Sequence, residues 1–266
     1  MNNRNPEATI TIPVDLYDPG EFLACCGLLE LTHRLTPAGQ RARGWFEETD
    51  APYHRFLISA FNNDDPLTFE KTILPLMKCT ITDKNPDSKE GPVLLGHPFN
   101  IILDWRSPFP QNGTIKTFAG QQDLFKIVTV LHKAVSDVKL DEISERTILS
   151  FRKPTEKEVT AFSVEKAENV LDSGFSMDIQ KNRLFRRTRV FLEYLALIGA
   201  QRFCPQTGED RLSRIYFAWR TPLTVHLAAI AASTFMGPLR QKGFISRMYE
   251  RDMNGRYKGF ASARAL

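Results

Sequence analysis

Cysteine is scarce in this chain: four residues occur in 266, and no two of them form a CxxC pair. The sequence therefore contains neither the ligand spacing of a zinc ribbon nor a thioredoxin-like redox motif. We expect all four to be buried, reduced thiols, as is usual in a reducing cytosol. They are Cys25, Cys26, Cys79 and Cys204.

Histidine is also rare, and its five residues have no spacing typical of metal ligands. We expect each to be packed or solvated, and we predict no metal site, no cofactor and no catalytic residue. The phosphate-binding glycine loops, the GxSxG nucleophile elbow and the HExxH zinc motif are all missing. These absences argue against an independent metabolic enzyme. The histidines are His33, His54, His97, His132 and His226.

No hydrophobic run has the length of a membrane span. The longest mainly apolar stretch, Leu223–Leu239, is interrupted by His226 and Pro238, so we expect a buried helix there. The polar opening Met1–Thr9 does not resemble a signal peptide. The sequence therefore predicts a cytoplasmic protein without membrane contact.

Charge is distributed unevenly along the chain. The net charge is +4, but residues 181–266 alone hold 16 Lys and Arg against 5 Asp and Glu, a balance of +11. Such asymmetry is typical of a half that binds a polyanion.

The first part of the chain predicts a compact α/β pattern. Its hydrophobic periodicity gives the order β-α-β-β-α-β, which is that of a ferredoxin-like unit and of RNA-recognition modules. The expected elements are a strand over Ala8–Val14, a helix over Glu21–Leu35, strands over Ala42–Glu47 and Tyr53–Phe61, a helix starting at Asp64-Asp65-Pro66, and a strand over Lys78–Asp83.

The remainder predicts a second, irregular α/β unit ending in a basic β-hairpin, so the fold class is α+β. We place the ferredoxin-like unit at 1–90 and the second unit at 91–266, and leave open whether they form one continuous body. The expected elements are strands over Asn100–Trp105, Phe175–Ile179 and Arg214–Arg220, helices over Gln121–Val135 and Asn182–Gln201, a helix from Thr221-Pro222, and a hairpin at Asn254-Gly255. Asp137–Ala167 is too weakly periodic to assign.

Three features of the sequence indicate nucleic-acid binding. The first is a group of arginines at the start of the helix expected over Asn182–Gln201, where free backbone N–H groups and guanidinium forks would bind phosphate. The alternatives are a solvated basic face and pairing with the acidic first half. These arginines are Arg183, Arg186, Arg187 and Arg189.

The second feature is the C-terminal hairpin. With Asn254-Gly255 as a two-residue turn, Tyr249 would pair with Phe260 and Arg251 with Lys258. Opposed like charges are unfavourable unless a polyanion covers them, and the rings offer stacking surfaces. The alternative is an edge ribbon kept soluble by its cations. The expected binding face is Arg247, Tyr249, Arg251, Arg256, Lys258 and Phe260.

The third feature is the loop Gly113–Gln122, where Lys116 lies between two glycines just before an expected helix. Backbone amides there would approach a phosphate closely. We include Lys116 among the expected nucleic-acid contacts.

Three blocks of the chain resemble CRISPR-associated proteins of type I-G (formerly I-U) effector modules. They are IPVDLYDPGEFLACCGLLELTHRL with ARGWF, the loop KTFAGQQ, and RLSRIYFAW with PLRQKGFISRMYERDMNGRYKGFASA. The residues of the first block that match are Pro19, Gly20, Phe22, Ala24, Cys25, Gly27, Leu28, Leu29 and Glu30.

This resemblance implies a RAMP-like subunit, built from ferredoxin-like folds, that works beside a crRNA in a Cascade-type complex for antiviral defence. The implied partners are crRNA, other effector subunits and, under the second alternative below, target DNA. Two alternatives stay open. One is a metal-independent crRNA-processing endoribonuclease, for which His33 or His54 would be the general base. The other is a large-subunit-like protein that contacts the PAM duplex or the target strand.

Overall fold

Helices and antiparallel sheets build the fold, which confirms the α+β class. The computed structural model describes residues 5–49, 53–87, 92–104, 124–154, 187–210, 212–250 and 258–266. Its helices are α1 (Pro19–Leu35), α2 (Phe69–Lys78), α3 (Leu124–Ser136), α5 (Val190–Gly199) and α6 (Val225–Ser233), with the 3-10 turns η3 (Leu140–Glu142) and η4 (Gly237–Leu239). No described helix is long and apolar enough to cross a bilayer.

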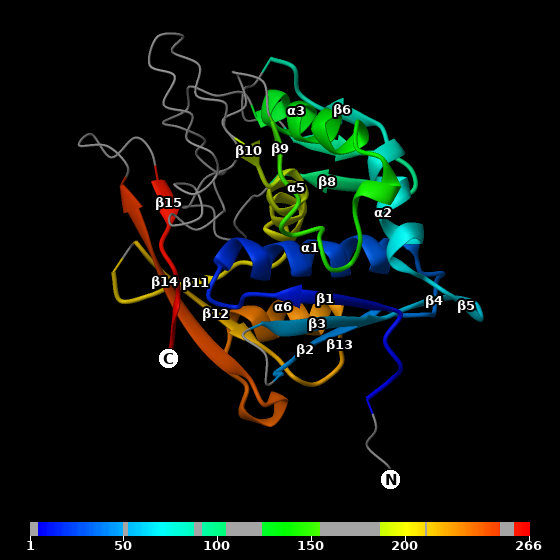
Figure 1. Ribbon diagram of the computed structural model, residues 1–266. Helices are drawn as coiled ribbons and strands as arrows, with labels where there is room; N and C mark the ends of the chain where they lie inside the picture. Colours follow the sequence, from blue (N-terminus) through cyan, green and yellow to red (C-terminus); the bar gives the residue numbers. More distant parts are fainter. Residues whose placement is uncertain are drawn as a thin grey trace.

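Helix α1 lies in the middle of the molecule, with a sheet and α6 on one side and α5, α2 and α3 on the other (Figure 1). Its start follows from local chemistry: Asp18 caps the helix by accepting the Gly20 N–H at 2.9 Å, and Pro19 occupies the first turn. Nearly all of its residues up to Thr32 are buried. The helix predicted over Glu21–Leu35 is therefore confirmed, two residues longer at its start.

The sheet beneath α1 is antiparallel and combines distant parts of the chain. Its last strand comes from the second half, so residues of both 1–90 and 91–266 contribute to it and to one hydrophobic core. The strand order is β1 (Ile10–Val14), β3 (His54–Ser59), β2 (Arg43–Glu47) and β13 (Leu223–Thr224).

The first 90 residues differ from a ferredoxin-like unit in the position of the fourth strand. The helix and strand order is as expected, but β6 does not join β1; it pairs with β7 in a separate sheet. At the outer edge of β1, the Thr11 N–H donates to the Glu145 carboxylate at 3.2 Å, so a side chain occupies a position that a fourth strand would use. The separate sheet consists of β6 (Ile81–Asp83), β7 (Val93–Leu95) and β8 (Ile101–Leu103).

Three predicted helix starts are wrong. Helix α6 begins at Val225 and not at Thr221-Pro222, because Leu223 and Thr224 form β13 and pair with β2. Helix α2 begins at Phe69, where Thr68 caps it, because Asp65 and Pro66 form β5 (Asp65–Pro66) in a small hairpin with β4 (Phe61–Asn62). Helix α5 begins at Val190 and not at Asn182, because the chain just before it forms β10 (Arg187–Thr188), which pairs with β9 (Lys153–Pro154).

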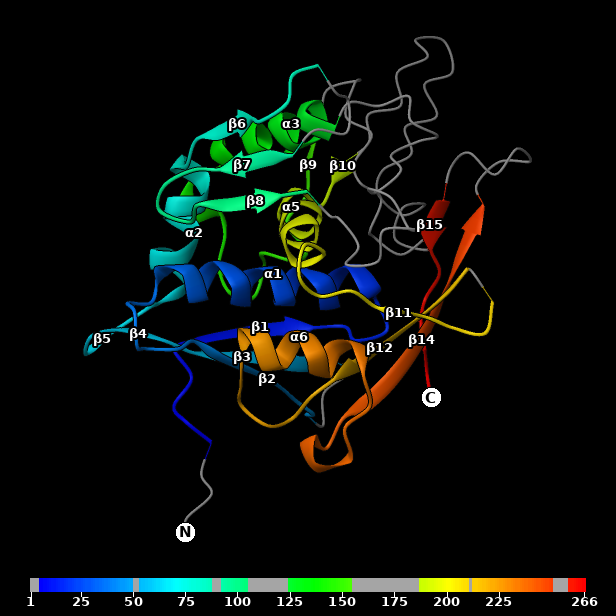
Figure 2. The ribbon, with the colours of Figure 1, turned by 180° about the vertical axis from the view of Figure 1, so that it is seen from behind.

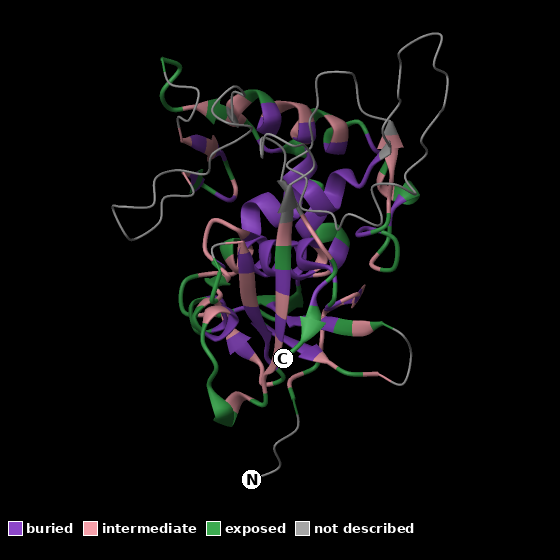
Figure 3. Ribbon diagram, turned by 90° about the vertical axis from the view of Figure 1, so that its left-hand side faces the viewer, coloured by how far each residue is buried: buried purple, intermediate pink, exposed green. Residues whose placement is uncertain are grey.

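Helices α1 and α5 cross with their backbones in contact. A Cβ atom added at Gly27 would lie 1.9 Å from the Leu195 carbonyl oxygen, and one at Gly199 would lie 2.1 Å from the Leu23 carbonyl oxygen. Only glycine fits at either position, since real Cβ contacts do not fall below about 3.0 Å. Every residue of α5 is buried, and Figure 3 shows burial concentrated on these central helices.

Trp219 connects the second half of the chain to the first sheet. Its ring is fully buried, and its Nε1–H donates to the Gly44 carbonyl at 2.7 Å. Its carbonyl accepts the Phe46 N–H at 2.8 Å, and its ring lies 5.0 Å from that of Phe46. A buried indole needs such a partner for its N–H, so the position of this residue is set by both packing and hydrogen bonding.

A second antiparallel sheet forms the C-terminal part of the fold (Figure 2). Its central strands are β12 and β14, and their inner face is buried through Tyr216 and Phe244. The strands are β11 (Gln206–Thr207), β12 (Ser213–Ala218), β14 (Lys242–Glu250), β15 (Lys258–Phe260) and β16 (Arg264–Ala265), the last two both pairing with β14.

Two expectations about burial need correction. Helix α6 forms within the stretch predicted to be a buried helix, but its Leu227 and Ile230 are 53% and 52% exposed. Cys204 is exposed because it follows the end of α5, whereas the other three cysteines are buried as expected.

We expect Gly27→Ala to destabilise the protein by about 3 kcal/mol or more, because the added methyl group overlaps the backbone of α5. The midpoint of urea unfolding would measure the change in stability. Gly237→Ala is the matched control: no atom lies within 4 Å of its added Cβ, so its stability should stay within about 0.5 kcal/mol of the original. Equal effects of the two substitutions would contradict the close helix crossing.

Candidate nucleic-acid interface

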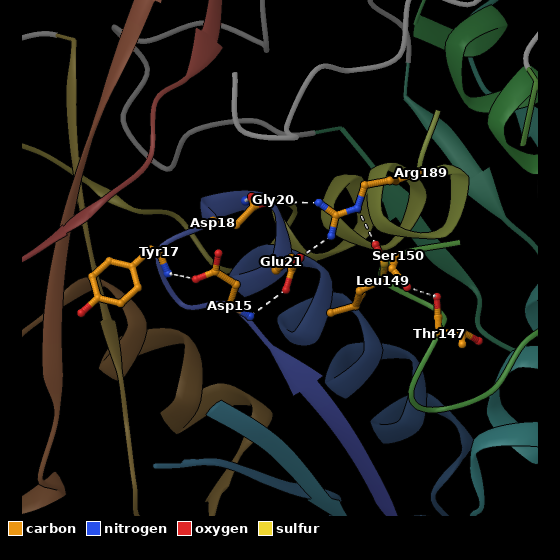
Figure 4. Close-up of polar contacts among 9 residues, drawn as sticks. All are labelled: Asp15, Tyr17, Asp18, Gly20, Glu21, Thr147, Leu149, Ser150 and Arg189. Atoms are coloured by element: carbon orange, nitrogen blue, oxygen red, sulfur yellow. Dashed lines mark hydrogen bonds and ion pairs between the residues drawn. The ribbon is translucent and has the colours of Figure 1, made fainter. Parts of the chain in front are cut away.

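Arg189 is buried at the junction of α1 and α5 and is not a surface phosphate ligand (Figure 4). Its guanidinium donates to Asp18 Oδ2 at 3.1 Å and to Glu21 Oε1, while its Nε–H donates to the Leu149 carbonyl at 2.6 Å. Asp18 is fully buried. The prediction that Arg189 binds phosphate is therefore wrong, and the alternative of pairing with the acidic first half describes this residue.

The Arg189 contacts have an electrostatic reason. Arg189 stands at the positive N-terminal end of α5, where a lone cation is unfavourable, and the two carboxylates beside it offset that cost. Burial raises the pKa of Glu21 above its ordinary value, against the opposing attraction of Arg189 and a hydrogen bond from the Asp15 N–H. The cluster therefore joins the starts of two helices. All three guanidinium nitrogens of Arg189 donate within the protein.

Most of the other predicted contacts cannot be compared with the structure. Arg187 lies in β10, where its backbone pairs with that of Pro154. Tyr249 and Lys258 lie in β14 and β15 and are described through their backbones alone. Lys116, Arg183, Arg186, Arg251 and Arg256 lie outside the described residues, as do the loop Gly113–Gln122 and the predicted strand Phe175–Ile179.

The C-terminal strands pair, but their register differs by one residue from the prediction. Phe260 pairs with Met248 and not with Tyr249, and Lys258 pairs with Glu250 and not with Arg251. A shift of one residue moves side chains to the opposite face of a sheet. The expected single basic-aromatic face is therefore wrong: Phe260 lies on the inner face and packs against the core, away from Arg247.

The outer face of this sheet carries two exposed arginines. Arg247 is on β14, and Arg264 on β16 pairs with Ile245, two residues before Arg247. Residues two apart on one strand share a face, so Arg247 and Arg264 are diagonal neighbours across the two strands. Neither arginine forms an ion pair within the described ranges. Around them lie the half-buried Ile215 and Ile245.

Arg247 attracts the carboxylate of Asp210 in the turn before β12. Hydrogen bonds from Ser213 and the Leu212 N–H hold the pKa of Asp210 below its usual range, and Arg247 adds a weaker attraction. The carboxylate therefore stays ionised but is already engaged by the turn before β12. The outer face thus combines two cationic side chains with apolar ones on a rigid sheet.

The sequence patterns did not indicate two residues of interest, Arg264 and His226. Arg264 was not selected, because its pairing with β14 depends on the path of the last residues and has no turn signal. His226 lies beside His33, with ring centroids 5.5 Å apart, although 193 positions separate them in the chain. No local pattern in the sequence relates these two histidines.

Comparisons of the chain with protein-family models, with curated proteins and with solved structures give no match. The structure adds one chemical restriction. In the part of the chain that it describes, no three His, Cys, Asp or Glu side chains come together to hold a metal ion.

We predict that Arg189→Ala lowers the free energy of unfolding by about 3–5 kcal/mol, because it leaves Asp18 buried without its partner. Arg247→Ala removes the same charge from an exposed position and should change stability by no more than about 0.5 kcal/mol. Chemical denaturation of both variants measures the difference. A small effect of Arg189→Ala would show that the buried ion pair does not hold the two helix ends together.

Proposed function

We propose that this protein is a crRNA-binding structural subunit of a type I CRISPR effector complex, built on a RAMP-like scaffold. The observation that carries the RNA-binding part is the outer face of the C-terminal sheet with Arg247 and Arg264. The placement in a CRISPR complex rests on the three sequence blocks described above, two of which contribute directly to α1 and to this sheet.

The physical case for RNA begins with the arginine pair. Two guanidinium groups on neighbouring strands repel each other across the sheet, and a phosphate between them would turn this repulsion into two charge-assisted hydrogen bonds. Arginine suits this role because its planar donors match phosphate oxygens. The free protein thus carries a small electrostatic cost that an RNA backbone would relieve.

The sheet itself adds a second argument. Its inner face is fixed to the core by Tyr216, whose hydroxyl donates to the Leu16 carbonyl at 2.7 Å, and by the stacked ring of Phe244. The outer face is therefore held rigid while Ile215 and Ile245 remain half-exposed. An exposed sheet face is also the surface on which RNA-recognition modules hold single strands, there by stacking bases on aromatic rings.

We expect the double variant Arg247→Ala/Arg264→Ala to weaken binding of a fluorescently labelled single-stranded RNA without reducing stability. The logarithmic salt dependence should become shallower by roughly 0.7 for each phosphate group that the variant no longer binds. Fluorescence anisotropy at several salt concentrations measures both quantities.

The matched control is Arg41→Ala/Arg146→Ala, which removes two exposed arginines from other parts of the surface. An equal decrease in affinity in both double variants would mean that net charge alone drives binding and would contradict the assignment of this face. Tighter binding of duplex DNA than of RNA would instead support the DNA-contacting alternative.

The complex itself is tested by co-expression of a tagged chain with the neighbouring effector proteins and a CRISPR array. We expect crRNA and effector subunits to co-purify with the tagged chain. Purification of the chain without either would refute a role in the complex, whatever its affinity for RNA.

A further inference from the structure

Three elements distant in sequence bring a group of cationic and imidazole side chains to one place. His33 and Arg34 lie on the last turn of α1, Arg202 follows the end of α5, and His226 lies on the first turn of α6. The rings of His33 and His226 meet edge to face at 81°. Arg202 Nη1 lies 3.1 Å from His226 Nδ1.

One buried carboxylate fixes the two arginines. Glu30, 2% exposed, accepts Arg202 Nε–H at 2.6 Å and Arg34 Nε–H at 2.9 Å, and a second Arg202 bond of 3.1 Å completes the arrangement. Burial alone would raise the pKa of Glu30, but the hydrogen bonds and charges of Arg202 and Arg34 outweigh it and lower this pKa. The carboxylate is therefore ionised, and a single negative charge faces two positive ones.

The imidazoles add hydrogen-bonding capacity to this excess positive charge. Because a guanidinium only donates, His226 Nδ1 must accept from Arg202, and its proton is then on Nε2. His226 is exposed, so this second nitrogen is open to a ligand. His33 Nδ1 is buried and has no hydrogen-bond partner among the described residues.

We propose that His33, His226, Arg34 and Arg202 form a phosphate-binding site, separate from the outer face of the C-terminal sheet. The four side chains supply donors to several oxygens at once, which suits a tetrahedral anion. The positive N-terminal end of α6 favours the same anion, because His226 lies in its first turn and the side chain of the N-cap residue Thr224 makes no capping hydrogen bond. The excess positive charge equally opposes a metal ion.

The protonation of His33 gives the site a measurable signature. Burial lowers the pKa of His33, and the neighbouring charges of Arg34 and Arg202 lower it further, against the attraction of Glu30. A bound phosphate would stabilise the imidazolium and raise this pKa. Since the ligand then favours the protonated form, binding of a phosphodiester, which stays ionised, should strengthen as pH falls through the pKa of His33 in the complex.

The experiment is an NMR titration of the histidine ring signals of the whole protein with two probes, inorganic phosphate and a short single-stranded RNA. We expect either probe to raise the pKa of His33 by about one unit, as a nearby opposite charge does. His226→Ala should weaken binding of the same probe about tenfold, the effect of removing one charge-assisted hydrogen bond. His226 is exposed, so its removal leaves the fold intact.

The matched control is His54→Ala, which removes a half-buried histidine from β3. All variants carry Arg247→Ala/Arg264→Ala, so that binding to the outer sheet face does not contribute. A response to phosphate alone identifies a free phosphate or phosphate monoester as the ligand; a response to RNA identifies a nucleic-acid backbone. No change in the pKa of His33 with either probe, or equal effects of His226→Ala and His54→Ala, would overturn the proposal.

Discussion

The contact of α1 with α5 at Gly27 and Gly199 is the constraint on which the rest of the structure depends. The backbones touch there, so any side chain at either position would push the helices apart. Helix α1 also covers the first sheet, and α5 connects to the turn that carries Arg202 (Figures 1 and 2). The separation of these two helices therefore decides whether Arg189 reaches Asp18 and whether Arg202 reaches Glu30.

Both of these arginines show how a basic segment divides its charges between structure and surface. Arg189 binds two carboxylates at the helix starts, and its burial removes it from any role in recognition. Arg202 neutralises Glu30 but keeps one edge of its guanidinium beside His226. A count of positive charges in residues 181–266 does not distinguish these cases from Arg247 and Arg264, which face solvent. The exposed pair is what the proposed RNA contact requires.

The two proposed sites differ in their chemistry. The outer sheet face has fixed positive charges with apolar neighbours, so its affinity should depend on salt far more than on pH between about 5 and 8. The affinity of the histidine cluster should depend on pH, because a bound phosphate would raise the pKa of His33, which burial lowers. Binding at the two surfaces can thus be distinguished in solution by its dependence on salt or on pH.

The sequence by itself determined the local elements. Alternating β-branched residues gave β1, and the Asp18-Pro19 start and apolar periodicity gave α1, since both depend on neighbours within a few positions. Only the tertiary structure decided how these elements combine. The fourth strand of the first sheet is β13 and not β6, the hairpin register is displaced by one residue, and His33 meets His226. Each outcome depends on contacts between residues far apart in the chain, where a one-residue shift or a different partner leaves the local sequence pattern unchanged.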